Sequence, residues 1–399
     1  MNRLIQRALV LATAALLSAC GVNDDDAPRT APTGFAVSAG DGSVLVTWDM
    51  EPGLTYWIFS AAAPAITREN YGQFAAARIT QPATSPQLIA GLANGTTYSF
   101  VINASRGGSP GGPATASIAV VPRLAGGVWT AGTPLAADLN AIGFGVGRYL
   151  AVGAGGALFT RGGGVLDTAW TAGTSGTSAS LNGLVTAGLM VAVGDAGTIL
   201  TSSDAVTWTA RASGTGERLN AVAFGLLAYV AVGDNGTIVR STDALTWNTV
   251  ASGTANALHG VALLGGTLVA VGANGTVLSS ADGGSTWTAA VSGTSATLRA
   301  AALGAGRYVI VGDGGTILTG TDLAAWSAAA SPTLRDLRRV VFGSQFVAVG
   351  AGGTALTSVD GLAWIAASTG TTADLRGLAR GVALDYLAVG SGGANLVSR

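Results

Sequence analysis

The sequence has 399 residues, of which 49% are hydrophobic and only 10% are charged. This length allows two or more domains, and the hydrophobic content is ample for buried cores, which excludes a globally disordered chain. Because the formal net charge is −1, the chain has no long-range positive field, and binding of nucleic acid through charge is not expected.

The basic residues and the single cysteine exclude further kinds of catalytic and metal site. All 20 basic residues are arginine, which excludes a phosphate-loop lysine, a Schiff-base lysine and a Ser–Lys nucleophile. The chain has one histidine, His259, and one cysteine, Cys20, so neither a clustered metal site nor an intrachain disulfide is expected. We therefore expect no cofactor and no metal.

The N-terminus has the pattern of a secretion signal. A basic segment precedes an apolar stretch over residues 8–17 that is too short to span a bilayer. The motif Leu-Ser-Ala-Cys that ends at Cys20 resembles the lipobox of bacterial lipoproteins. This resemblance implies a signal peptide over residues 1–19, lipid attachment at Cys20 and a lipidated tether over residues 20–30. An ordinary secretory signal with a chance cysteine is the alternative.

The residue after Cys20 indicates the membrane to which a lipoprotein would be sorted. It is Gly21 rather than aspartate, which by resemblance to Gram-negative lipoproteins implies sorting to the outer membrane. The chain is therefore expected in the cell envelope, held to a membrane through its N-terminal lipid.

Residues 31–122 alternate in hydrophobicity over short segments separated by turns, which predicts an antiparallel β-sandwich. Strands are expected at residues 43–48, 54–59 and 98–104. The segment resembles a fibronectin type III module, with Trp48 at the core tryptophan and Tyr98 at the tyrosine corner. The resemblance implies a spacer or a binding unit, and a spacer is favoured.

From residue 128 to residue 399 one unit recurs, with four short strand-like segments in each copy. A Val-Gly step returns at intervals of 38–41 residues, and its glycines are Gly153, Gly194, Gly233, Gly272, Gly312, Gly350 and Gly390. A tryptophan of the same unit recurs at Trp129, Trp170, Trp208, Trp247, Trp287, Trp326 and Trp364. The repeat predicts an all-β chain in which the fibronectin-like sandwich is followed by a seven-bladed β-propeller.

The phase of the repeat predicts how the ring closes. Trp129 precedes the first Val-Gly step, whereas the chain ends one strand after Gly390 without another tryptophan. The last blade would then combine three C-terminal strands with one N-terminal strand, a 3+1 closure that leaves no open edge. A solenoid of stacked repeats would need polar caps, which neither end provides.

The turn before the repeated tryptophan carries an aspartate. The segment from Ser280 to Trp287 matches the Asp-box of sialidase-type (BNR) repeats, and shorter versions occur in other units. These aspartates are Asp204, Asp243, Asp282 and Asp360. We interpret them as structural, because a carboxylate can accept backbone N–H bonds in a tight turn while the tryptophan packs between blades.

Catalysis is not expected, although the Asp-box invites comparison with sialidases. The Arg-Ile-Pro motif of those enzymes is absent, and the repeat region has one glutamate, Glu217, so a carboxylate pair has few candidates. Through its Val-Gly-Asp-x-Gly-Thr-Ile-Leu units, the region resembles the propellers of photosystem II assembly factors and their bacterial relatives. That resemblance implies a scaffold that binds proteins.

One polar residue per unit follows a leucine at the start of the expected inner strand. These residues are Asn140, Asn182, Asn220, His259, Arg299, Arg338 and Arg376. They should surround one mouth of the central channel, and three consecutive arginines would make that mouth electrically lopsided. Asp195, Asp234 and Asp313 should lie on the same face, where they would cap their own turns or add a negative sector.

Two interpretations of this ring stay open. The arginines Arg299, Arg338 and Arg376, with His259 and Asn220, are our candidates for binding a partner, which would be an envelope protein or an acidic glycan. Alternatively, the side chains only solvate the rim, with Asp336 and Asp374 pairing Arg338 and Arg376. The leading function is thus a membrane-anchored, non-enzymatic scaffold. A glycan-binding or glycan-processing surface protein is the alternative.

Overall fold

The computed structural model describes residues 28–106, 109–164, 167–381 and 385–399. The chain divides into two compact units, residues 1–123 and residues 124–399, which are described separately below. Cys20 and the predicted signal peptide lie outside the described residues. Within the described part, no helix is both long and apolar enough to cross a membrane.

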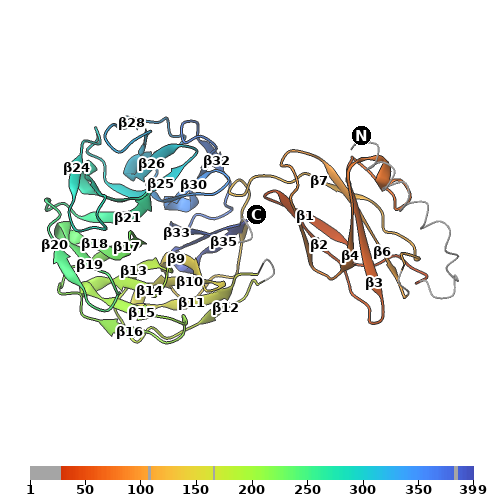
Figure 1. Cartoon of the computed structure of the whole chain (residues 1–399), viewed down its shortest axis with the longest axis horizontal. Helices are drawn as coiled ribbons and strands as arrows, with labels where there is room; N and C mark the ends of the chain where they lie inside the picture. Colours follow the sequence, from red (N-terminus) through yellow and green to blue (C-terminus); the bar gives the residue numbers. More distant parts are fainter. Residues whose placement is uncertain (1–27, 107–108, 165–166, 382–384) are drawn as a thin grey trace. The chain divides into compact units, whose positions relative to one another are not determined.

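The N-terminal unit consists of two antiparallel sheets that pack face to face (Figure 1). One sheet has the order β1-β2-β5, with β1 at Ala36–Gly40, β2 at Ser43–Thr47 and β5 at Gln87–Ala90. The other has the order β4-β3-β6-β7, with β3 at Thr55–Ala62, β4 at Ala75–Ala83, β6 at Tyr98–Ser105 and β7 at Ile118–Val120.

Strand alternation gives the second sheet two buried faces. Tyr56 and Ile58 of β3 point to the core between the sheets, where Trp48 and Tyr98 are also buried. Trp57 of β3 belongs to a second cluster that includes Ile66, on the chain segment between β3 and β4. The sheet is therefore covered on its second side by its own connection.

The C-terminal unit contains, within the described residues, seven four-stranded antiparallel sheets. The first three consist of β9 (Leu139–Gly145), β10 (Arg148–Gly153), β11 (Leu158–Gly162) and β12 (Trp170–Ala172); of β13 (Leu181–Val185), β14 (Met190–Gly194), β15 (Ile199–Ser202) and β16 (Thr209–Arg211); and of β17 (Leu219–Gly225), β18 (Ala228–Gly233), β19 (Ile238–Ser241) and β20 (Asn248–Val250).

The next three sheets repeat this strand order. They consist of β21 (Leu258–Leu264), β22 (Thr267–Gly272), β23 (Val277–Ser280) and β24 (Thr288–Ala290); of β25 (Leu298–Gly304), β26 (Arg307–Gly312), β27 (Ile317–Gly320) and β28 (Ser327–Ala328); and of β29 (Leu337–Phe342), β30 (Phe346–Gly350), β31 (Ala355–Ser358) and β32 (Ile365–Ala367). The last sheet combines β33 (Leu375–Arg380), β34 (Tyr386–Gly390) and β35 (Asn395–Ser398) with β8 (Thr130–Ala131).

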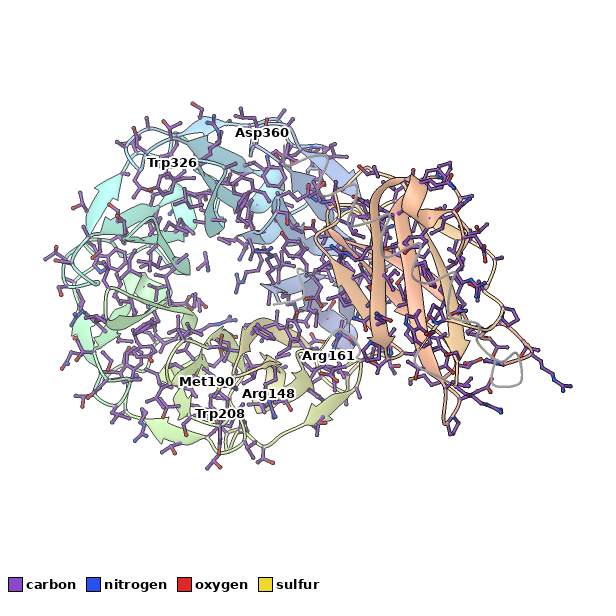
Figure 2. The ribbon with its side chains drawn as sticks, turned by 45° about the vertical axis from the view of Figure 1, so that its right-hand side comes forward. Arg148, Arg161, Met190, Trp208, Trp326 and Asp360 are labelled. Atoms are coloured by element: carbon purple, nitrogen blue, oxygen red, sulfur yellow. The ribbon has the colours of Figure 1, made fainter. Side chains whose placement is uncertain are left out.

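The seven sheets form a closed ring. The first strand of each sheet contacts the first strand of the next, and β33 returns to contact β9 (Figure 1). The strand after Trp129 completes the last sheet, because β8 pairs antiparallel with β35 through Leu396↔Ala131 and Val397↔Thr130. The repeated tryptophans lie near the outer strands, as Trp208 and Trp326 show in Figure 2.

Each inner strand carries a bulge beside its first residue. The leucine that begins the strand pairs with the glycine of the Val-Gly step, and the residue after the leucine is skipped in the register. A Cβ on any of the seven glycines would lie 1.9–2.3 Å from the carbonyl oxygen of the residue before that leucine. Glycine is therefore required at this step by the close approach of two backbone segments, and the bulge re-aims the skipped side chain.

Candidate functional site: the mouth of the central channel

The seven skipped residues of the bulges converge on one cavity. The cavity has a volume of about 330 Å³, and the skipped residues that line it are Asn140, Asn182, Asn220, His259, Arg299, Arg338 and Arg376. Each comes from a different sheet, at the start of its inner strand. The structure thus brings together all five candidate partner-binding residues from the sequence, together with Asn140 and Asn182.

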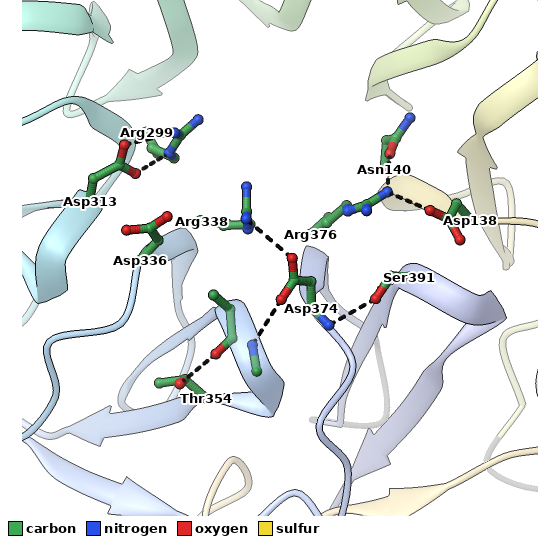
Figure 3. Close-up of polar contacts among 12 residues, drawn as sticks. Asp138, Asn140, Arg299, Asp313, Asp336, Arg338, Thr354, Asp374, Arg376 and Ser391 are labelled. Carbon is green, nitrogen blue, oxygen red and sulfur yellow. Dashed lines mark hydrogen bonds and ion pairs between the residues drawn. The ribbon is translucent and has the colours of Figure 1, made fainter.

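The three arginines of the ring are ion-paired (Figure 3). Arg299 forms a bidentate pair with Asp313, in which its Nη2 lies 2.8 Å from Asp313 Oδ2. Arg338 Nη2 lies 3.3 Å from Asp374 Oδ2. Arg376 Nη1 lies 3.1 Å from Asp138 Oδ2 and also donates to Asn140 Oδ1. All three guanidinium groups are therefore held in fixed orientations.

These pairs correct the partners that the sequence suggested. Asp336 does not pair with Arg338, and Asp374 pairs with Arg338 rather than with Arg376. The reason is that each aspartate before an inner strand reaches back to the preceding sheet. Asp374 Oδ1 accepts from Gly352 N at 2.9 Å and Asp336 Oδ1 from Gly314 N at 3.0 Å. This places Asp374 beside Arg338 of the preceding sheet, and Asp138, whose Oδ1 accepts from Gly392 N, is placed beside Arg376 in the same way.

The aspartates of the Val-Gly-Asp turns hold the skipped residue of their own sheet. Asn182 Nδ2 donates to Asp195 Oδ1, and Asn220 Nδ2 donates to Asp234 Oδ1, both at 2.8 Å. Asp313 does the same for Arg299. These aspartates therefore orient the skipped side chains, and Asp313 also neutralises the charge of Arg299. They do not form a separate negative sector.

Sequence reasoning missed two arginines of this cavity. Arg218 precedes the leucine that begins β17; its Nε lies 3.2 Å from Asp195 Oδ1, and its Nη2 donates to Asn182 Oδ1. Arg339 follows Arg338 in β29. A signal for Arg339 exists in the sequence, because only this unit has two arginines after the inner-strand leucine.

His259 lines the same cavity, and its side chain makes no hydrogen bond to another described residue. Burial and, secondly, the nearby charge of Arg299 lower its pKa below the usual 6.5, while Asp234 and Asp313 oppose this shift. The imidazole is therefore neutral at pH 7. Protonation of His259 is therefore less favourable in the folded protein than in the unfolded chain.

We expect this group to make the fold less stable in mild acid. The unfolded histidine binds a proton below about pH 6.5, whereas the folded one resists protonation, so stability falls as the pH decreases from that value toward the folded pKa. The His259→Asn variant should lose less stability than the natural protein between pH 7.5 and pH 5.5, measured by urea unfolding. Equal losses of stability in the two proteins would contradict a lowered pKa of His259 in the folded state.

The Asp-box aspartates lie at the opposite ends of the strands from the channel mouth. Each accepts two backbone N–H bonds of its own turn; Asp204 Oδ1, for example, accepts from Val206 N and Thr207 N, both at 2.8 Å. The same arrangement occurs at Asp243, Asp282 and Asp360. These bonds lower the pKa of Asp204, Asp243 and Asp360, and the pKa of Asp282 is lowered first by the Thr286 hydroxyl and then by the backbone bonds. All four carboxylates are therefore occupied within their own turns.

Comparisons with known proteins identify the fold of the C-terminal unit. The model of the family described as DUF6242 beta propeller domain matches residues 201–301. No curated protein sequence matches the chain significantly. Among solved structures, the chain is similar to YCF48 bound to D1 peptide, with 18% identity, a TM-score of 0.56 and coverage of 67% of this chain and 94% of that chain.

Two further structures show the same similarity. YCF48 from Cyanidioschyzon merolae has 17% identity and a TM-score of 0.55, with 68% of this chain and 98% of that chain covered. A streptogramin B lyase has 14% identity and a TM-score of 0.60, with 68% and 97% covered. At these identities the likeness concerns the fold alone, and propellers of this fold include both a peptide-binding protein and a lyase. The C-terminal unit is a β-propeller.

Proposed function

We propose that this protein is a non-enzymatic scaffold that binds another protein of the cell envelope at the mouth of its propeller channel. One observation carries the proposal: seven sheets each contribute one bulged polar side chain to the same cavity. An array built by seven separate bulges presents hydrogen-bond donors in a fixed pattern. Such an array suits the recognition of a partner surface.

The chemistry of the mouth favours an acidic partner segment. Arg299, Arg338 and Arg376 are oriented by aspartates, and each guanidinium carries five N–H donors, more than its present bonds use. Spare donors in a fixed plane favour bidentate contact with a carboxylate. The similarity to YCF48 bound to D1 peptide supports a protein as the class of partner, while it leaves the partner of this chain unnamed.

We further propose that the seven sheets are the blades of one seven-bladed propeller, and that the N-terminal unit is a fibronectin type III-like spacer. Support for the fibronectin type III-like fold comes from Trp48, which is buried in the core, and from Tyr98, whose hydroxyl accepts from Ala93 N at 3.1 Å as in a tyrosine corner. The lipid anchor at Cys20 and the outer-membrane location complete the proposal. They rest on the sequence motif.

The binding proposal predicts the effect of removing the three arginines. Replacing Arg299, Arg338 and Arg376 by alanine should reduce recovery of envelope proteins crosslinked to the full-length chain by at least about tenfold, because central arginines commonly dominate an interface. The triple lysine variant keeps the charges but loses the planar fork, so it should recover an intermediate amount. Recovery is quantified by mass spectrometry after crosslinking in intact cells.

A matched control separates binding from folding. Arg148 begins β10 and Arg307 begins β26, so both lie at the strand ends opposite the channel mouth. Their double alanine variant should recover partners as the natural protein does. Unchanged recovery by the triple alanine variant, with a normal thermal unfolding midpoint, would refute the assignment of the partner site.

A further inference from the structure

The residue that follows each bulge points to a second feature of the channel. These residues line a deeper cavity of about 250 Å³ and are Ala141, Gly183, Ala221, Gly260, Ala300, Arg339 and Gly377. Six sheets thus have alanine or glycine at this position, and one sheet has arginine. Arg339 also lines the cavity at the mouth, as does Arg299. The long, charged side chain of Arg339 therefore occupies a position that alanine or glycine leaves open in the other six sheets.

Arg339 lacks the partner that the other arginines of the mouth have. Arg218, Arg299, Arg338 and Arg376 each form an ion pair with an aspartate. Among the described residues, no carboxylate pairs with Arg339; its Nη1 donates to the carbonyl oxygen of Arg338 at 3.0 Å. The buried Nε of Arg338 likewise has no acceptor. Arg339 thus keeps guanidinium donors that no described carboxylate uses, in a cavity lined by four other arginines.

The electrostatic surroundings of Arg339 are unfavourable for a cation. Burial, and then the positive charges of Arg299 and Arg338, lower its pKa to about 10. At neutral pH the guanidinium still carries its proton. Arg339 is only partly buried, but a charge that is partly withdrawn from water and has no counter-charge still costs the fold free energy unless another group neutralises it.

We propose that the junction of the two cavities is a binding site for a small oxyanion of the phosphate or sulfate class, with the guanidinium group of Arg339 as its principal donor. The space suits such a ligand, because about 330 Å³ is roughly ten times the volume share of one water molecule. Below the junction the walls are apolar, with Val222, Val261 and Leu378 among them. The charged group is thereby confined to the level of the arginines.

This site goes beyond the proposed scaffold function. Arg339 is not among the three arginines assigned to the partner, and the site can be tested on the purified protein alone. Absence of anion binding would leave the partner assignment intact, and loss of partner recovery would leave the anion site intact.

The test compares thermal unfolding of the full-length protein in sodium phosphate and in sodium chloride of equal ionic strength. A ligand that binds only the folded state raises the midpoint, and we expect phosphate to raise it by about 2–4 °C relative to chloride. Sulfate should act similarly. A parallel series with glycerol phosphate distinguishes a free anion from a phosphate ester, since a larger shift with the ester indicates that the phosphate belongs to a larger molecule.

Two variants make the test specific. Arg339→Ala copies the residue found in three other sheets, so it should fold; without phosphate its midpoint should equal or exceed that of the natural protein, and the phosphate shift should vanish. Arg339→Met, which keeps more of the side-chain volume, should behave in the same way. Arg148→Ala, at the opposite strand ends, should retain the full shift.

Two results would overturn the proposed oxyanion site. One is a natural protein whose midpoint is the same in phosphate and in chloride. The other is a full phosphate shift in Arg339→Ala or Arg339→Met.

Discussion

Deletion of residues 123–134 is expected to open the propeller ring. The deleted segment contains β8, which is the fourth strand of the last sheet, and Trp129, which packs among Val347, Tyr386 and Leu396. Truncating a buried tryptophan to alanine alone costs about 3–5 kcal/mol, against a typical domain stability of about 5–15 kcal/mol. The deletion also leaves β35 with an unpaired edge, which favours pairing with a second molecule.

Size-exclusion chromatography with light scattering and thermal unfolding would measure both effects. We expect the deleted protein to unfold at a much lower temperature or to form dimers and larger species. A monomer with an unchanged unfolding midpoint would show that β8 is dispensable.

A pair of single substitutions separates loss of packing from loss of the closure. Trp129 and Trp364 are about equally buried, and each indole N–H donates to the carbonyl oxygen three residues earlier. Trp364 lies in a sheet whose four strands are continuous in sequence. Trp129→Ala and Trp364→Ala should therefore be similarly destabilised, whereas self-association should be confined to Trp129→Ala.

Substitution of Gly350 by alanine should be nearly as damaging. A Cβ at this residue would lie 1.9 Å from the carbonyl oxygen of Asp336, and a backbone atom cannot move aside as a flexible side chain can. We expect a loss of about 3 kcal/mol or more in the free energy of unfolding, at or above the upper range for overpacking. Urea unfolding followed by tryptophan fluorescence would measure the change.

Gly216→Ala is the matched control for this substitution. Gly216 has no heavy atom within 4 Å of the position of a Cβ, and its φ is not positive. Its replacement should change the stability by less than about 0.5 kcal/mol, as at most surface positions. Equal effects of the two substitutions would contradict the role given to the Val-Gly step.

Much of the architecture follows from short-range features of the sequence. The Val-Gly step and the tryptophan recur at nearly constant intervals, so each unit could be recognised without reference to distant residues. The phase of Trp129 against Gly390 then predicted the pairing of β8 with β35, which the structure contains. The second core of the N-terminal unit was not predicted, because the segment that covers Trp57 has no regular periodicity.

The site could be predicted only in part, since its details depend on contacts between neighbouring sheets. The Leu-x pattern identified the residues of the channel mouth, because one position per unit suffices to place a ring. The partners of Arg338 and Arg376 could not be read in this way, since each is an aspartate of the following sheet. Arg339, by contrast, could have been found from the sequence, because the other six units have alanine or glycine at the equivalent position.

The bulge at the start of each inner strand also bears on how such a protein can diversify. The skipped residue takes no part in the strand register, so it is freed from the alternation that fixes core and surface positions. Changes at Asn140, Asn220 or Arg338 would alter the chemistry of the cavity while the glycine and leucine that shape the bulge stay in place. The fold thus offers seven variable positions around one cavity, and a new ligand preference can arise from a few point mutations without redesign of the scaffold.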